Sequence, residues 1–110
     1  MSGGRFEYTQ HSILEIVDEI ERELNSQGKE KPKSELYSTE EFYQRYPEEK
    51  YYYTHPEEIQ EKFREGIKAL KKAYIFAQRI DWYLSGDDGE DSFLKRLEEE
   101  LNKLEHEKEN

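Results

Sequence analysis

The feature that most limits the fold of this chain is a regular seam of apolar and small residues in its second half. The seam residues follow one another at alternating steps of four and three: Ile59, Phe63, Gly66, Leu70, Ala73, Ala77, Ile80 and Leu84. A repeat of about 3.5 residues is typical of a helix that packs against other helices. Pro56 suits a first helical turn, where its missing N–H needs no partner. The sequence therefore predicts one helix over residues 56–85, roughly 40–45 Å long at about 1.5 Å per residue.

A second amphipathic pattern precedes this long helix near the start of the chain. Apolar residues again alternate in steps of four and three over Ile13, Val17, Ile20 and Leu24. Ser12 and Glu15 have the spacing of a capping box, and Gly28 suits a helix C-terminus. We expect a helix over residues 13–26. Residues 5–10 before it read either as a short strand or as an extended lead-in, and the lead-in is favoured because no partner strand is evident.

Two further helices complete the prediction. Ser38 and Glu41 form another capping box before a short helix over residues 39–46, which Pro47 ends. The last helix is expected over residues 92–106, with Ser92 as its cap and leucines at helical spacing. Short connections make neighbouring helices antiparallel. The expected fold is all-α: a small antiparallel helical bundle in one domain over residues 1–110, with flexible ends at 1–4 and 107–110.

Composition limits the size of the core and the classes of partner. Of the 110 residues, 33% are hydrophobic and 40% are charged, so the core should be thin and association would stabilise it. The net charge of −10 opposes general binding to DNA, RNA or anionic lipid. The chain contains no cysteine, no signal pattern and no apolar run of about 20 residues. These features favour a cytoplasmic protein with no membrane partner.

Residue types that carry chemistry occur without the required spacing. His11, His55 and His106 form no helical ligand pair, and residues 86–91 differ from a calcium-binding loop, so we expect no metal and no other cofactor. The acidic residues of that turn are expected to be solvated and to favour the next helix N-terminus. Asp81, beside apolar residues, is expected to pair with Arg79 or another arginine. Phosphate-binding loops and nucleophile elbows are absent from the sequence, so we predict no enzyme.

The long helix is basic although the chain is acidic. Between residues 59 and 80 the sequence has two glutamates and six basic residues: Lys62, Arg64, Lys68, Lys71, Lys72 and Arg79. One interpretation is internal complementarity with acidic flanking helices. The other is a basic face for an acidic partner, which would require Lys68, Lys71 and Lys72 to project away from those helices.

Tyrosines gather in residues 37–53, where they alternate with glutamates. Their rings could form a lid over the long helix, or an exposed patch that recognises a protein, and the sequence leaves both interpretations open. The candidate interaction surface predicted from these two features consists of Tyr43, Tyr46, Tyr51, Tyr52, Tyr53, Lys68, Lys71 and Lys72.

Residues 77–89, with the sequence AQRIDWYLSGDDG, resemble a stretch of small uncharacterised bacterial proteins, some of them encoded by phages and mobile elements. The resemblance implies a small accessory protein and no particular activity.

Three functions are compatible with the sequence. The first is a non-catalytic helical module for protein–protein interaction, which could form a homodimer because the long helix leaves part of its seam uncovered. The second is an acidic mimic of nucleic acid that inhibits a nuclease or DNA-binding protein. The third, least favoured because of the acidic remainder of the chain, is direct nucleic-acid binding by the basic face.

Overall fold

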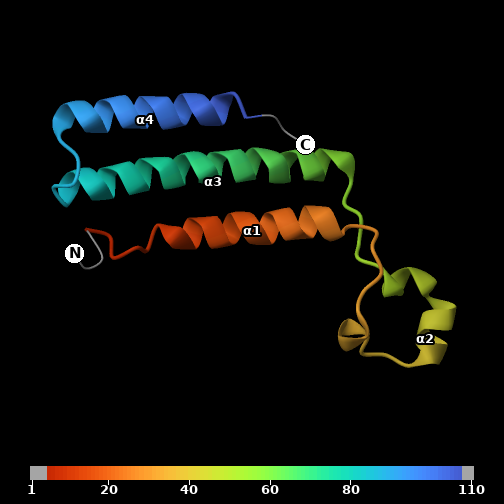
Figure 1. The fold of residues 1–110 in the computed structure, drawn as a ribbon. Coiled ribbons are helices and arrows are strands. Elements are labelled where there is room, and N and C mark those ends of the chain that lie inside the picture. Colours follow the sequence, from red (N-terminus) through yellow and green to blue (C-terminus); the bar gives the residue numbers. More distant parts are fainter. Residues whose placement is uncertain (1–4, 108–110) are drawn as a thin grey trace.

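The computed structural model describes residues 5–107 and shows an all-α protein organised on one long helix, α3 (Glu57–Leu84). The helices α1 (His11–Ser26) and α4 (Glu90–Glu105) both run antiparallel to α3 and pack on either side of it (Figure 1). The backbones of α1 and α4 do not approach each other closely. The molecule measures 64 × 31 × 14 Å, so the three helices form a layer little more than one helix thick. The predicted antiparallel all-α bundle is confirmed.

The predicted helix over residues 56–85 is confirmed to within one residue at each end. Pro56 stands just before the helix rather than in its first turn, and its carbonyl accepts hydrogen bonds from the N–H groups of Ile59 and Gln60. The seam is only partly covered: Phe63 is half-buried, whereas Leu84 remains exposed. A helix that is longer than its neighbours therefore keeps apolar surface in contact with solvent.

The predicted helix caps are wrong although the helices themselves are present. α1 begins at His11, two residues early, because a turn over residues 5–10 leads directly into it. Carbonyls of that turn accept from the N–H groups of His11, Ser12 and Ile13, so no hydroxyl cap is needed. Residues 5–10 accordingly form no strand. In α4, which follows Gly89, Ser92 lies inside the first turn.

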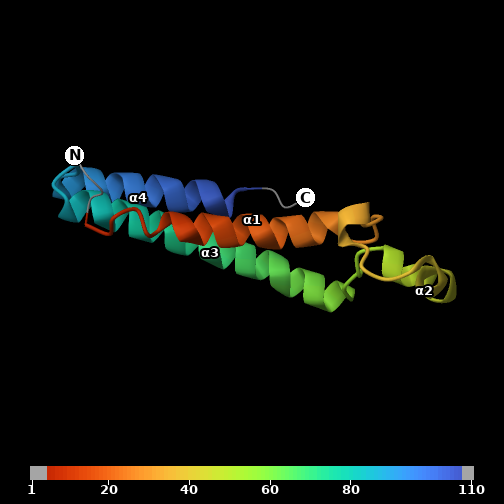
Figure 2. The same cartoon turned by 90° about the horizontal axis from the view of Figure 1, so that it is seen from below.

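Between α1 and α3 the chain forms a small separate lobe, residues 29–54, which we call the tyrosine lobe (Figures 1 and 2). It contains the short helix α2 (Glu40–Arg45) and two 3-10 turns, η1 (Lys33–Glu35) and η2 (Pro47–Lys50). Thr39, not Ser38, caps α2 by accepting from the N–H of Phe42. α2 packs on η2 and on no helix of the bundle.

The tyrosine lobe is closed at its base by paired backbone. The N–H of Gly28 donates to the carbonyl of Tyr52 at 2.9 Å, and Tyr52 donates back to Lys29 at 2.9 Å. Lys31 donates to Lys50 at 2.8 Å one step farther along. α1 ends at Ser26, as predicted, and Gly28 two residues later has a φ of +74°, a conformation that favours glycine. We call this pairing the neck.

The hydrophobic core is thin, as the composition predicts. Among residues 5–107 the only fully buried apolar side chains are Val17 of α1 and Leu104 of α4. The other apolar residues on the inner sides of the helices are half-buried. A single layer has two large faces and little interior, so each helix buries only one narrow stripe. The predicted flexible ends at 1–4 and 108–110 lie outside the described residues; Glu107 is described and pairs with Lys71.

Candidate functional site

The tyrosine lobe presents aromatic side chains to solvent instead of covering α3. Tyr37 and Tyr53 are 88% and 67% exposed, and Tyr46 and Tyr51 are exposed as well. The lobe lies beyond the N-terminal end of α3 in both views (Figures 1 and 2), and the ring of His55, the residue that follows the lobe, packs on Phe63 of α3. The lid interpretation is therefore wrong, because α2 and η2 pack on each other at the end of the bundle.

Two of the predicted tyrosines hold the lobe together. The hydroxyl of Tyr43 accepts from the N–H of Ser38 at 3.3 Å, and its ring meets Phe42 edge-on. The hydroxyl of Tyr52 donates to Glu35. This hydrogen bond, together with burial and the negative charges of Glu35 and Glu23, raises the pKa of Tyr52. Tyr43 and Tyr52 thus support the lobe, and the exposed rings remain available for contact.

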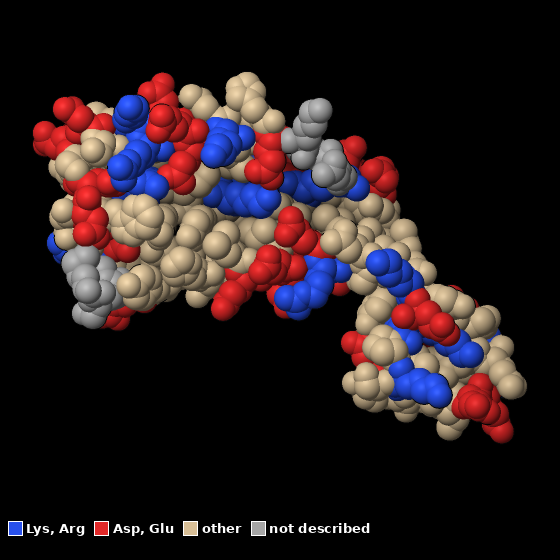
Figure 3. Space-filling model, viewed as in Figure 1, with Lys and Arg blue, Asp and Glu red and all other residues tan. Residues whose placement is uncertain are grey.

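The predicted lysines lie on the bundle, apart from the tyrosines, and two of them face acidic residues. Lys68 pairs with Glu105 at 3.6 Å, and Lys71 pairs with Glu107 at 3.0 Å. Lys72 is exposed. Figure 3 shows carboxylates above a line of basic side chains on the viewed side of the bundle, with the lobe set apart. The ion pairs between α3 and the end of α4 agree with the first interpretation, internal complementarity. The lysines and the tyrosines lie on different parts of the structure and do not form one surface.

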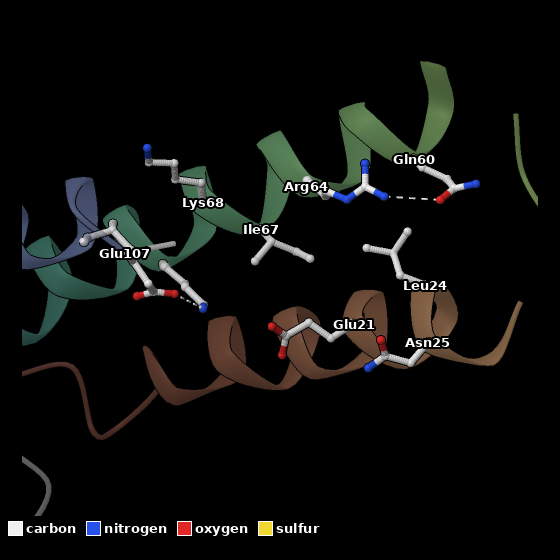
Figure 4. A pocket seen from close by; sticks show the side chains of 10 residues that line it. Glu21, Leu24, Asn25, Gln60, Arg64, Ile67, Lys68 and Glu107 are labelled. Atoms are coloured by element: carbon white, nitrogen blue, oxygen red, sulfur yellow. Dashed lines mark hydrogen bonds and ion pairs between the residues drawn. The ribbon is translucent and has the colours of Figure 1, made fainter. Parts of the chain in front are cut away.

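A groove runs along the bundle between α1 and α4, over α3. One part of it has a volume of about 370 Å³ and an apolar floor that includes Leu24, Ile67 and Leu104. Figure 4 shows Ile67 of α3 and Leu24 of α1 directed into the space between these two helices, with Arg64 directed toward Gln60. The groove is open, and charged side chains from α1 and α3 line its rim. The part of the chain that the structure describes holds no group of three histidine, aspartate or glutamate side chains able to bind a metal ion.

An ion cluster fixes the turn between α3 and α4. Arg79 and Arg96 each reach the buried Asp88 at 3.2 Å, and Arg79 also pairs with Glu100. The guanidinium of Arg79 lies 4.4 Å from the ring centre of Trp82. The sequence interpretation missed this cluster, since it treated the acidic turn as solvated. The sequence did hold one signal for this cluster. Arg79 lies near the end of α3 and Asp88 lies nine residues later in the turn, so the two side chains could meet.

Asp81 anchors the N-terminal segment, and the predicted ion pair with an arginine is wrong. Its buried carboxylate accepts from the N–H groups of Arg5 and Phe6, from the side-chain amide of Gln10 and from the hydroxyl of Ser85. Burial alone would raise the pKa of Asp81, but these hydrogen bonds together outweigh burial and lower it. These hydrogen bonds fix residues 5–10 against α3. The role of Asp81 is structural, because both of its carboxylate oxygens already accept hydrogen bonds from donors within the chain.

No helix among residues 5–107 is both long and apolar enough to cross a membrane. Comparisons of the chain with protein-family models, with curated proteins and with solved structures find no match.

Proposed function

We propose that this chain is a small non-catalytic accessory protein that binds another protein through its tyrosine lobe. The observation that carries the proposal is the exposure of Tyr37, Tyr46, Tyr51 and Tyr53 on a lobe that does not pack along the bundle. Single exposed aromatics are common on protein surfaces, but several on one small element are typical of interaction sites. Tyrosine also offers a large contact area at a low cost in side-chain entropy.

The chemistry of the lobe indicates what kind of partner surface would fit. The lobe also carries exposed charges of both signs: Glu40, Glu41, Glu48 and Glu49 in α2 and η2, and Lys29, Lys33 and Arg45. The complementary surface has apolar pockets for tyrosine and a rim that carries charges of both signs. Rim charges mainly change the association rate and its dependence on salt, whereas buried rings determine the dissociation rate.

Salt dependence separates this function from the acidic mimic of nucleic acid. A complex built on tyrosines should lose little affinity as salt rises, whereas a mimic that binds a basic groove through carboxylates should weaken steeply. Within the structure, Asp88, Glu100 and Glu105 already pair with basic residues of the same chain, which favours the tyrosine-based function.

The test compares the proteins captured by the wild-type chain with those captured by two single variants. Tyr53→Ser removes an exposed ring of the lobe, and Tyr8→Ser removes a ring that is also more than half exposed but lies outside it. We expect proteins captured by the wild type and by Tyr8→Ser to be lost with Tyr53→Ser. Direct binding to the purified candidate then confirms the loss. Equal capture by all three chains would refute the role of the lobe.

A further inference from the structure

The groove between α1 and α4 extends past the point where α4 ends. Ion pairs join Lys68 to Glu105 and Lys71 to Glu107, so α4 ends level with residues 68–71 of α3. The preceding part of α3, residues 57–67, is about 16 Å long. Figure 1 shows α1, and no other helix among residues 5–107, running beside this part. We call the 370 Å³ part of the groove at this place the open end of the groove.

The open end has an apolar edge and a cationic edge. Ile67 of α3 and Leu24 of α1 form the apolar edge, between these two helices (Figure 4). Lys68 follows Ile67 by about 100° around the helix, and Figure 4 shows it directed away from α1. Arg64 precedes Lys68 by four residues and therefore lies on the same side of α3. A ligand in the open end meets apolar surface on one side and positive charge on the other.

α3 separates its charges between faces along this stretch. Residues 57–71 carry four glutamates and four basic residues. Three of the basic residues, Arg64, Lys68 and Lys71, line the open end, whereas none of these four glutamates does. With Glu21 and Glu107 counted, the lining carries a net charge of +1 in a chain whose net charge is −10. The charge of the open end is therefore opposite to that of the whole molecule and complementary to an acidic ligand.

The basic residues of the open end already bind carboxylates of the same chain. Besides the two lysine pairs at the end of α4, Arg64 pairs with Glu57 at 3.6 Å. All three carboxylate side chains are more than half exposed. Exposed ion pairs contribute only about 0–1 kcal/mol each. Carboxylates of a partner can therefore replace them at little cost.

We infer that the open end of the groove binds an acidic amphipathic helix of a partner protein. The lining from Gln60 to Lys71 is about 17 Å long, the length of a helix of about 12 residues. The apolar side of that helix lies on Leu24 and Ile67. Its carboxylates, four residues apart, lie against Arg64 and Lys68, because two helices rise equally per residue. Such docking of an amphipathic helix in an apolar groove is a common mode of recognition.

Other classes of ligand fit this place less well. The open end is exposed to solvent along its length, whereas sites for small molecules bury most of the ligand surface. A nucleic acid carries charge along its whole backbone, and Glu21 on the opposite rim, with the net charge of −10, would repel it. The acidic helices of a second copy have their apolar sides packed on their own α3.

The test titrates the full chain into a fluorescent peptide of about 14 residues, cross-linked between side chains because so short a helix does not persist alone. Leucines occupy one side of the peptide and glutamates the neighbouring side, and a second peptide has lysines in place of the glutamates. Fluorescence anisotropy should show saturable binding of the acidic peptide and none of the lysine peptide. Changes in amide chemical shift should centre on Leu24 and on residues 60–71.

Charge reversal identifies the residue that recognises the acidic side. Lys68→Glu should weaken binding of the acidic peptide at least about tenfold and should confer binding of the lysine peptide. Lys72→Glu is the matched control, because it makes the same change on an exposed residue of α3 outside the groove lining. It should change the affinity less than about twofold. Tyr53→Ser should leave peptide binding unchanged, since the inference does not rest on the tyrosine lobe.

Several results would overturn the inference. These are no saturable binding of the acidic peptide, equal binding of the two peptides, and equal effects of Lys68→Glu and Lys72→Glu. Tighter binding of anionic lipid vesicles or of an oligonucleotide, lost with Lys68→Glu, would assign the open end to another class of ligand. Loss of the acidic peptide with Tyr53→Ser would place it on the tyrosine lobe instead. Failure of the lobe to capture a partner leaves the peptide result unaffected, so the two proposals are tested separately.

Discussion

Replacing Arg79 by methionine should destabilise the fold far more than an ordinary loss of a surface charge. The Arg79 side chain is only 12% exposed and pairs with Asp88, whose side chain is 2% exposed. Removing one partner of a buried ion pair costs about 3–5 kcal/mol. Arg96 still contacts Asp88, which reduces this cost, while the lost stacking on Trp82 adds about 0.5–1 kcal/mol. We expect a loss of about 2–4 kcal/mol in the free energy of unfolding, or roughly 10–20 °C in Tm.

The measurement is urea and thermal unfolding followed by circular dichroism at one fixed protein concentration. Arg22→Met is the matched control, since Arg22 pairs with Glu19 while both side chains are about 70% exposed. Such pairs contribute about 0–0.5 kcal/mol. A double-mutant cycle of Arg79→Met with Asp88→Asn isolates the coupling between the two side chains. If Arg79→Met and Arg22→Met change the unfolding free energy equally, the cluster does not hold the α3–α4 turn and the reasoning fails.

Three further perturbations test other parts of the structure. Val17→Ala should cost about 2 kcal/mol in unfolding free energy, measured by urea denaturation, because Val17 is one of the few fully buried apolar side chains and its truncation leaves a cavity. The pKa of Asp81 is lowered by folding, so its stabilising effect is present above the ordinary carboxyl pKa and is lost as pH falls through the lowered value. The protection factor of the Phe6 amide, which is the exchange rate of an unfolded peptide divided by that of the amide at the same pH, should therefore fall in acid, and Asp81→Asn should remove that pH dependence. Gly28→Ala should cost about 1–2 kcal/mol, because alanine disfavours a φ of +74°, and should accelerate amide exchange at Tyr52 without unfolding the bundle.

Helix positions could be predicted from the sequence because they depend on local periodicity. The seam from Ile59 to Leu84 reports directly which residues share a side of a helix, and α3 begins and ends within one residue of the prediction. Caps could not be predicted in the same way. The Ser12 pattern is formally a capping box, but the preceding turn already satisfies the first N–H groups of α1. Whether a hydroxyl is needed depends on the path of the chain before the helix.

The site depends on contacts between distant residues, which the sequence pattern does not contain. Asp81 accepts from the backbone N–H groups of Arg5 and Phe6, and backbone donors carry no residue-type signal. The place of residues 37–53 was equally open, because tyrosine suits both a core and a surface. The pairing of Lys68 and Lys71 with acidic residues was the part of the charge pattern that periodicity and composition did anticipate.

The neck of the tyrosine lobe has a consequence for how such a chain can change. Because Gly28 and Tyr52 are held together by a backbone hydrogen bond, the chain leaves the bundle and returns to it at one point. Neither α2 nor η2 packs on α1, α3 or α4. We expect that residues 32–49 can be shortened, or exchanged for an unrelated peptide, while the remainder folds unchanged, so that one bundle can carry loops of different length and sequence.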